Sequence, residues 1–194
     1  MHNKNKSTIF SLLITLGLSV ATNSALADPV LEYKLALADD GKSYEVWMKP
    51  SVTPKPNISL TGQITLKVPH AANFKPTDVV AGVEGTDWIE ASRVDAPKED
   101  PKHDYISFSY IGAQGNSSQN YAWAADEELL VFSFANEKGC VNGLSIMQNN
   151  DPFNIPNNSQ QTNPGNQFTN LGWGAVGENN FKGVYGDSPK CLKK

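Results

Sequence analysis

Apolar and polar side chains alternate with a period of two over most of the chain, which is the pattern of β-strands with one buried face. Residues 60–68 show it most clearly. Their even-numbered apolar positions are predicted to face a core: Leu60, Ile64, Leu66 and Val68. The odd-numbered polar positions are predicted to face outward: Thr61, Gln63, Thr65 and Lys67.

Further strands are predicted at residues 30–37, 43–48, 79–83, 88–94, 105–111, 129–134, 144–147, 168–173 and 181–185. The turn signal Asp39-Asp40-Gly41-Lys42 joins the first two runs into a hairpin, whereas residues 73–78 are expected to form a turn. No run has the longer period of an extended amphipathic helix. Short strands separated by turns predict an all-β, antiparallel β-sandwich, and a single closed sheet is the alternative.

The first 27 residues have the three parts of a cleavable signal peptide. Lys4 and Lys6 supply the positive start, residues 9–20 are apolar, and Ala25-Leu26-Ala27 is a small-x-small cleavage pattern. A membrane anchor is the alternative, but the apolar run is shorter than the roughly 20 residues that cross a bilayer. We therefore expect export, to the cell surface, the extracellular space or the periplasm, with residues 28–194 forming one domain. No later segment is apolar enough to span a membrane.

The charge of the exported part argues against a nucleic-acid partner. Removing Lys4 and Lys6 from the 16 basic residues leaves 14 against 20 acidic ones, a net charge of −6. Proteins that bind the negatively charged phosphates of nucleic acids need a basic surface. A net negative charge also disfavours binding to an anionic membrane surface, because like charges repel.

Both cysteines, Cys140 and Cys191, lie in the exported part, where an even number predicts a disulfide. The bond would join the C-terminal tail to the body of the domain. A zinc site is a poor alternative, because two thiolates without a nearby histidine make an incomplete ligand set.

The order of several segments resembles cohesin-type domains of bacterial surface proteins. These segments are residues 44–47, 58–66, 105–108 and 128–134. They are followed by Asn150-Asp151-Pro152-Phe153 and by residues 156–159, 163–167 and 179–186. The resemblance implies an Ig-like jelly-roll sandwich that serves binding or assembly. No residue here matches a dockerin contact of that family, so none is transferred.

Residues 149–166 are unusually rich in asparagine and contain one possible calcium site. Oxygen atoms of Asp151, Asn149 and Asn154 are ligands of the kind that calcium uses. Asparagine is also common in turns, where its side chain bonds to the backbone. That structural interpretation is favoured, because a single carboxylate and no EF-hand spacing are present.

Exposed aromatic side chains are candidates for stacking on sugars. Tyr121 and Trp123 follow a polar loop and Trp173 lies between glycines, so these three are the predicted surface candidates. Trp47 and Trp88 occur in strand patterns and are expected in the core or on a strand face. Packing is favoured over sugar binding for the whole set, because aromatic rings bury large areas in sandwich cores.

Catalytic chemistry has little support in the sequence. The exported part has two histidines, His70 and His103, and no nucleophile elbow, HExxH or phosphate loop. The adjacent acids Glu127 and Glu128 would point to opposite faces of a strand.

We therefore expect a non-enzymatic protein without a cofactor that acts through protein–protein contact, as an adhesion, matrix or filament subunit. Self-association is part of this expectation, and the first strand could be donated to a neighbouring copy. A carbohydrate-binding module is the alternative.

Overall fold

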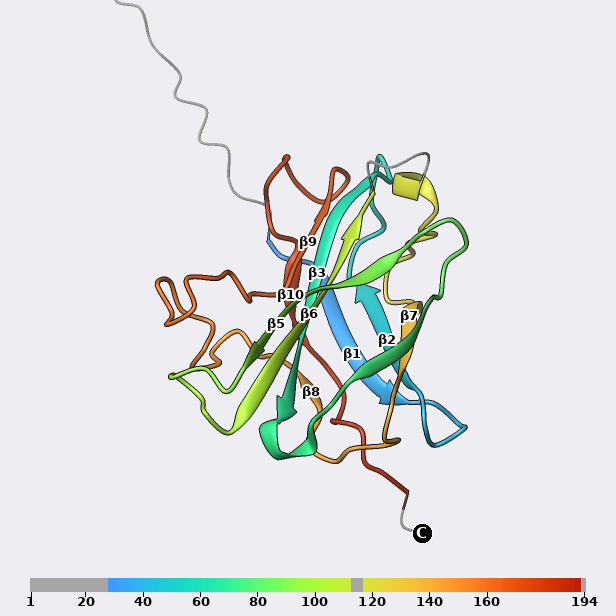
Figure 1. The fold of residues 1–194 in the computed structure, drawn as a ribbon. Coiled ribbons are helices and arrows are strands. Elements are labelled where there is room, and N and C mark those ends of the chain that lie inside the picture. The colour runs from blue at the N-terminus through green and yellow to red at the C-terminus, as the bar shows by residue number, and fades with distance from the viewer. Residues whose placement is uncertain (1–27, 113–116, 193–194) are drawn as a thin grey trace, which may run out of the picture.

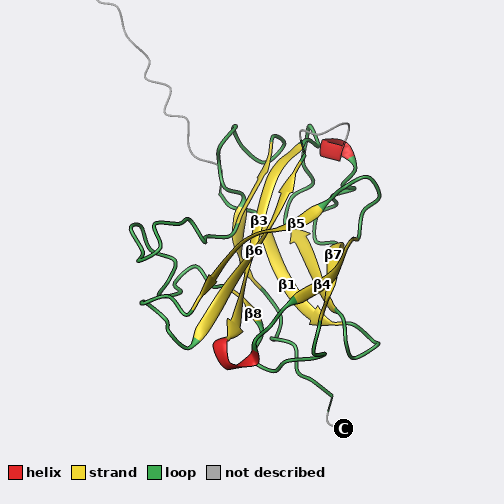
Figure 2. Ribbon diagram, in the orientation of Figure 1, coloured by secondary structure: helices red, strands yellow, loops and turns green. Residues whose placement is uncertain are grey.

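The computed structural model describes residues 28–112 and 117–192, so the predicted signal peptide lies outside the described residues. Within them the chain forms a β-sandwich of two packed sheets, as the alternation predicts (Figures 1 and 2). The strands are β1 (Leu31–Leu37), β2 (Tyr44–Pro50), β3 (Ser59–Pro69), β4 (Pro76–Ala81), β5 (Trp88–Asp95), β6 (His103–Ile111), β7 (Leu129–Asn136), β8 (Ser145–Ile146), β9 (Gln167–Asn170) and β10 (Phe181–Val184). Two short 3₁₀ turns, η1 (His70–Ala72) and η2 (Ser117–Gln119), complete the elements. In these parts of the chain, no helix has the length and apolar character needed to cross a membrane.

The first sheet, sheet A, has the strand order β10-β1-β2-β7-β4. β1 and β2 form the predicted hairpin, in which the Asp40 carboxylate accepts bonds from the backbone of Lys42 and Ser43 to fix the turn. β1 lies between β10 and β2, so both of its edges are paired within this chain, which is the alternative to its donation to another copy. The β1–β10 pair is parallel, which departs from the antiparallel expectation. Parallel neighbours need a crossover rather than a hairpin, and these two strands come from opposite ends of the described chain.

The second sheet, sheet B, has the strand order β5-β6-β3-β8, and β9 also pairs with β3. β3 is the longest strand and pairs with β6 along nearly its whole length. On its other edge it pairs with β9 near Ser59–Gln63 and with β8 at Leu66 and Lys67.

The expected turn at residues 73–78 is partly wrong, because β4 already begins at Pro76. Proline is tolerated at the start of an edge strand, since it withholds only a donor that faces outward. The ladder between β4 and β7 is irregular between Thr77 and Val80, and Asp78 adopts a left-handed conformation with φ 51°. This edge of sheet A is therefore distorted.

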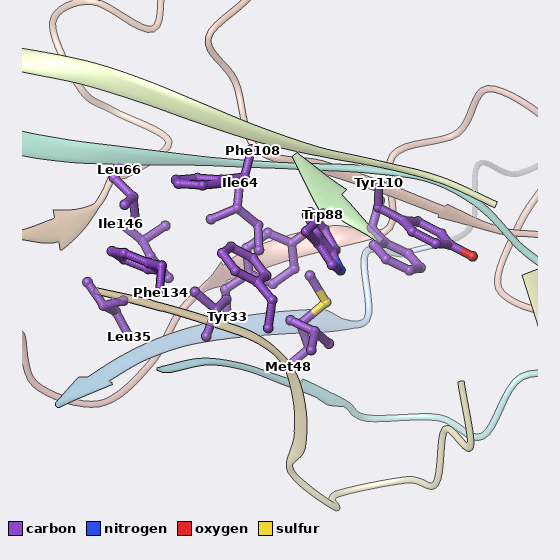
Figure 3. Packing of buried hydrophobic residues seen from close by; sticks show 14 of the residues in the cluster. Tyr33, Leu35, Met48, Ile64, Leu66, Trp88, Phe108, Tyr110, Phe134 and Ile146 are labelled. Carbon is purple, nitrogen blue, oxygen red and sulfur yellow. The ribbon is translucent and has the colours of Figure 1, made fainter. Parts of the chain in front are cut away.

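Aromatic side chains from both sheets fill the space between them. Phe134 from sheet A packs against Phe108 from sheet B, with ring centroids 5.5 Å apart (Figure 3). The ring centroid of Phe132, also from sheet A, lies 5.2 Å from that of Phe108. Trp88 at the start of β5 stacks on Phe132 at 5.0 Å. The predicted inward positions Ile64, Leu66 and Val68 are fully buried. Leu60 is only half-buried, because the pairing of β3 with β9 shifts register between Ser59 and Thr61.

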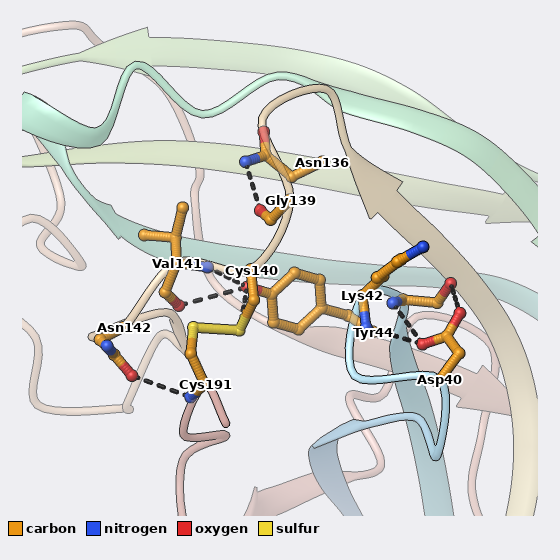
Figure 4. Close-up of a disulfide and its surroundings, with 10 residues drawn as sticks. Asp40, Lys42, Tyr44, Asn136, Gly139, Cys140, Val141, Asn142 and Cys191 are labelled. Atoms are coloured by element: carbon orange, nitrogen blue, oxygen red, sulfur yellow. Dashed lines mark hydrogen bonds between the residues drawn. A yellow bond between two sulfur atoms is a disulfide. The ribbon is translucent and has the colours of Figure 1, made fainter. Parts of the chain in front are cut away.

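The predicted disulfide between Cys140 and Cys191 is present and holds the C-terminal tail beside the end of sheet A (Figure 4). The Tyr44 hydroxyl lies next to it, accepts a hydrogen bond from the Val141 N–H at 2.6 Å and lies 3.5 Å from the Cys140 sulfur. The Cys191 N–H donates to the Asn142 side chain at 2.9 Å. The tail is thus fixed both covalently and by hydrogen bonds.

Candidate functional site

The three aromatic residues proposed as a sugar platform are not on the surface. Tyr121, Trp123 and Trp173 are exposed by only 0, 4 and 5%. Their rings contact one another: Trp123 lies 4.9 Å from Tyr121 and 5.6 Å from Trp173, measured between centroids. The surface prediction is therefore wrong, and the packing interpretation holds.

The polar atoms of these rings find partners inside the protein, which explains how they can be buried. The Trp123 indole N–H donates to the Ser59 hydroxyl at 3.0 Å, and the Trp173 indole N–H donates to the Val52 carbonyl at 2.7 Å. The Trp88 indole N–H donates to the Tyr121 hydroxyl at 2.9 Å. Burial raises the pKa of Tyr121 well above its ordinary value.

The asparagine-rich residues 149–166, here named the cover, lie against the outer face of sheet B. In Figure 1 they form the orange segment on the side of β5 and β6, away from β2 and β7. Asn166 accepts a hydrogen bond from the Thr65 N–H at 2.8 Å and donates to the Met147 carbonyl at 2.7 Å. The Thr65 hydroxyl donates to the Pro164 carbonyl at 2.6 Å. Thr65 faces outward as predicted, but the cover buries it completely.

The cover also holds itself together through asparagine side chains. The buried Asn158 donates to the Thr162 carbonyl at 2.8 Å and accepts from the backbone N–H groups of Gln160 and Thr162 at 3.2 Å. Asn154 donates to the Asn149 carbonyl at 3.0 Å. These are side-chain-to-backbone bonds of the kind that favours asparagine in turns.

The calcium hypothesis for Asp151, Asn149 and Asn154 does not fit this arrangement. The Asp151 carboxylate accepts hydrogen bonds from the Lys67 ammonium, the Tyr105 hydroxyl and the Phe153 N–H, so its oxygens face donors and a positive charge. Over the described residues, no group of three or more His, Cys, Asp or Glu side chains is arranged to hold a metal ion. Asp151 instead belongs to an intramolecular hydrogen-bond network.

That network is a cluster of charged groups that sequence reasoning did not bring together. Lys67 on β3 lies 2.7 Å from Asp151 in the cover and 2.6 Å from Asp100 in the β5–β6 loop. The Tyr105 hydroxyl on β6 donates to Asp151 at 2.7 Å and to Asp100 at 3.0 Å. The His103 ring nitrogen lies 2.9 Å from Asp100. Three segments far apart in sequence therefore meet at one lysine.

The contacts within the cluster shift the pKa values of Asp100, Lys67 and Tyr105. Burial alone would raise the pKa of Asp100, but hydrogen bonds from Lys67, His103 and Tyr105 outweigh it and hold the pKa well below its ordinary range. Burial would lower the pKa of Lys67, and the two carboxylates reverse this and raise it. Burial and the Asp151 carboxylate raise the pKa of Tyr105 far above its ordinary value. The hydroxyl therefore stays protonated and remains a donor.

The cover leaves one half of the outer face of sheet B open. Trp88 and Tyr110 are a cross-strand pair that points into the core, so their neighbours Ile89 and Ile111 point outward. These two isoleucines are 53 and 52% exposed. Thr61 on β3 pairs with Ile111 and is also exposed. We name this surface, made of Thr61, Ile89, Ser109 and Ile111, the open half of sheet B.

The outer face of sheet A carries charged side chains around one tryptophan. Trp47 on β2 is half-buried there, with the Lys34 ammonium 5.4 Å from its ring centroid. Lys34 forms an ion pair with Glu128, which lowers the pKa of Glu128. A shallow hollow next to Trp47 is lined by Asp39, Glu45 and Ser133, among others. Trp47 is thus a strand-face residue, one of the two locations predicted for it.

Comparison with known protein families, curated proteins and solved structures found no match to this chain. The cohesin-type resemblance remains a prediction from the sequence.

Proposed function

We propose that this chain is an exported, non-catalytic β-sandwich that acts through protein–protein contact, as an adhesion, matrix or filament subunit at the cell surface. The observation that carries the proposal is the open half of sheet B. Ile89 and Ile111 lie diagonally across β5 and β6, within reach of each other, and both are about half exposed. Adjacent exposed isoleucines on the face of a sheet suit burial against another protein.

The geometry of β5 favours contact through side chains rather than strand addition. β5 is the outermost strand of sheet B and, within the described residues, pairs with β6 alone. Its ladder is broken by a register shift between Glu90 and Ser92. Such irregular edges resist pairing with a further strand. Export is supported by the Cys140–Cys191 disulfide, because disulfides persist in oxidising compartments.

The test is the association state of the exported protein, measured by sedimentation at several concentrations. We expect concentration-dependent self-association that Ile89→Ser and Ile111→Ser weaken. Val80→Ser is the matched control, since Val80 is 58% exposed on β4 of the other sheet. A protein that stays monomeric at every concentration, and whose position 89 forms no crosslink through a photoreactive residue in its native cells, would contradict the proposal.

Carbohydrate binding is a second candidate, supported by the hollow at Trp47. An aromatic face flanked by Asp39, Glu45 and Ser133 offers stacking together with acceptors for sugar hydroxyls. Binding to a glycan array that Trp47→Ala abolishes would support this function. If no glycan binds the wild-type protein, the candidate fails. Trp123 and Trp173 are unsuitable test positions, because their replacement would damage the core.

A further inference from the structure

The cluster around Lys67 contains more than an ion pair requires. One amine, two carboxylates and a phenolic hydroxyl meet within hydrogen-bond distance, and they come from β3, the β5–β6 loop, β6 and the cover. A salt bridge needs only one carboxylate beside the lysine. The two additional groups, the Asp100 carboxylate and the Tyr105 hydroxyl, lie where they could assist a reaction between Lys67 and Asp151.

The surroundings of Asp151 favour attack by a nucleophile on its Cγ atom. Its side chain is 4% exposed. The oxygen Oδ1 accepts hydrogen bonds from the Tyr105 hydroxyl at 2.7 Å and the Phe153 N–H at 2.9 Å. Two donors at one oxygen stabilise the negative charge that this oxygen gains when a nucleophile attacks Cγ. The other oxygen, Oδ2, faces the Lys67 ammonium at 2.7 Å.

Asp100 is placed to take a proton from Lys67. Its Oδ2 lies 2.6 Å from Lys67 Nζ, on a carboxylate separate from the one under attack. The charged pair is the resting state, and a lysine must give up a proton before it can act as a nucleophile. Because the reaction occurs once in the life of each molecule, a small population of the neutral pair is sufficient.

We propose that Lys67 Nζ and Asp151 Cγ form an intramolecular amide bond that links β3 to the cover. A first proton passes from Nζ through Asp100 to Oδ2 of Asp151, and the neutral amine attacks Cγ. A second proton follows the same route, the Cγ–Oδ2 bond breaks and Oδ2 leaves as water. Asp100 ends as the carboxylate it was at the start, and no oxidant or further reactant is needed.

The surroundings favour this condensation. The fold holds the amine against the carboxyl, so the two groups need not meet by diffusion. In well-oriented intramolecular reactions, the effective concentration of one group at the other reaches roughly 10⁵–10⁸ M. Tyr105, Met147 and Phe153 form a buried apolar group beside the cluster, with the Tyr105 and Phe153 rings 4.7 Å apart. These side chains limit access of water to the product. The bond also removes a charged pair from a largely buried site, where charges are costly.

The experiment is the intact mass of the exported protein after reduction of its disulfide. We expect a mass lower than that of the linear chain by one water molecule. We also expect a branched tryptic peptide that joins the Lys67 segment to the Asp151 segment, with no cleavage after Lys67. Lys67→Arg keeps a positive charge but should restore the full mass. Asp100→Asn, which leaves both reacting groups in place, should lower the fraction of linked protein at least tenfold.

The matched control is Lys34→Arg, because Lys34 also forms an ion pair with a carboxylate, Glu128, on the outer face of sheet A. This variant should keep the water loss. A wild-type protein with the full linear mass would overturn the proposal. A water loss that persists in Lys67→Arg would also overturn it, since the loss would then come from another site.

Discussion

The sandwich is held by two layers of contact with different chemistry, the aromatic core between the sheets and the polar cover outside sheet B. In the core, rings such as Phe108 and Phe132 are fully buried against other rings. The cover buries polar groups, among them its own Asn158 and Asn166 and Thr65 of β3, and hydrogen bonds satisfy them. Apolar burial tolerates small shifts, whereas each buried amide needs its own partner in one geometry. The stability of the cover therefore depends on individual hydrogen bonds, whereas that of the core depends on the apolar area that it buries.

The largest effect is expected in the core. Phe132→Ala removes a fully buried ring that contacts Trp88, Phe108 and Phe134, so the free energy of unfolding should fall by about 3–5 kcal/mol. Urea unfolding followed by tryptophan fluorescence measures the change. Val80→Ala on the neighbouring strand β4, where the side chain is exposed, should change stability by about 0.5 kcal/mol or less. Equal losses in the two variants would contradict the assignment of the core.

A covalent link fixes the C-terminal tail, which belongs to neither layer. Replacing Cys140 and Cys191 by serine opens a loop with a sequence separation of 51, and the loop-entropy model gives a loss of roughly 3–4 kcal/mol. The expected result in urea unfolding is a lower midpoint with both layers retained. A double variant as stable as the wild-type protein would show that the other tail contacts alone fix the segment.

The sequence predicts the core between the sheets, because the core positions follow a local period of two. Inward positions such as Ile64, Leu66 and Val68 alternate within one strand, so a short window contains the information. The disulfide was also predictable, because two cysteines allow one pairing. The pairing of β1 with β10 was not, since no local signal in residues 31–37 points to a segment some 150 residues later.

The cover shows why exposure could not be predicted. Thr65 is an outward polar position, and only the return of Pro164 and Asn166 to that face buries it. The Lys67 cluster likewise requires Asp100 and Asp151 to approach one strand, which depends on tertiary structure. Tyr121 and Trp123 follow a polar loop, yet the partners of their polar atoms lie on other segments. The polar composition of the preceding loop therefore gave an incorrect prediction of exposure for these two rings.

An intermediate effect is expected when one amide of the cover is removed. Asn166→Ala leaves the Thr65 N–H and the Met147 carbonyl without their partner, and an unsatisfied buried group costs about 1–3 kcal/mol. Amide hydrogen exchange at Thr65 should also become faster. Asn149→Ala is the control, because Asn149 is exposed and its side chain makes one long bond, 3.4 Å to the Lys182 carbonyl. If both variants behave alike, the cover is not held by its buried amides.

The smallest effect is expected at the outer rim of the cover and should depend on pH. The Glu99 carboxylate accepts hydrogen bonds from the Ser159 N–H and hydroxyl, both at 2.7 Å, and the bonds with Ser159 lower the pKa of Glu99 below its ordinary value of 4.5. A carboxyl with a lowered pKa stabilises the folded state above its ordinary pKa, and this contribution disappears as the pH falls through the folded-state value. Glu99→Gln should therefore be less stable than the wild-type protein at neutral pH, and the difference should vanish in acid. Urea unfolding of both proteins from neutral pH to well below 4.5 measures it, with the exposed Glu90→Gln on β5 as the control. A difference that stays constant with pH would mean that Ser159 is held by hydrogen-bond geometry alone, without the carboxylate charge.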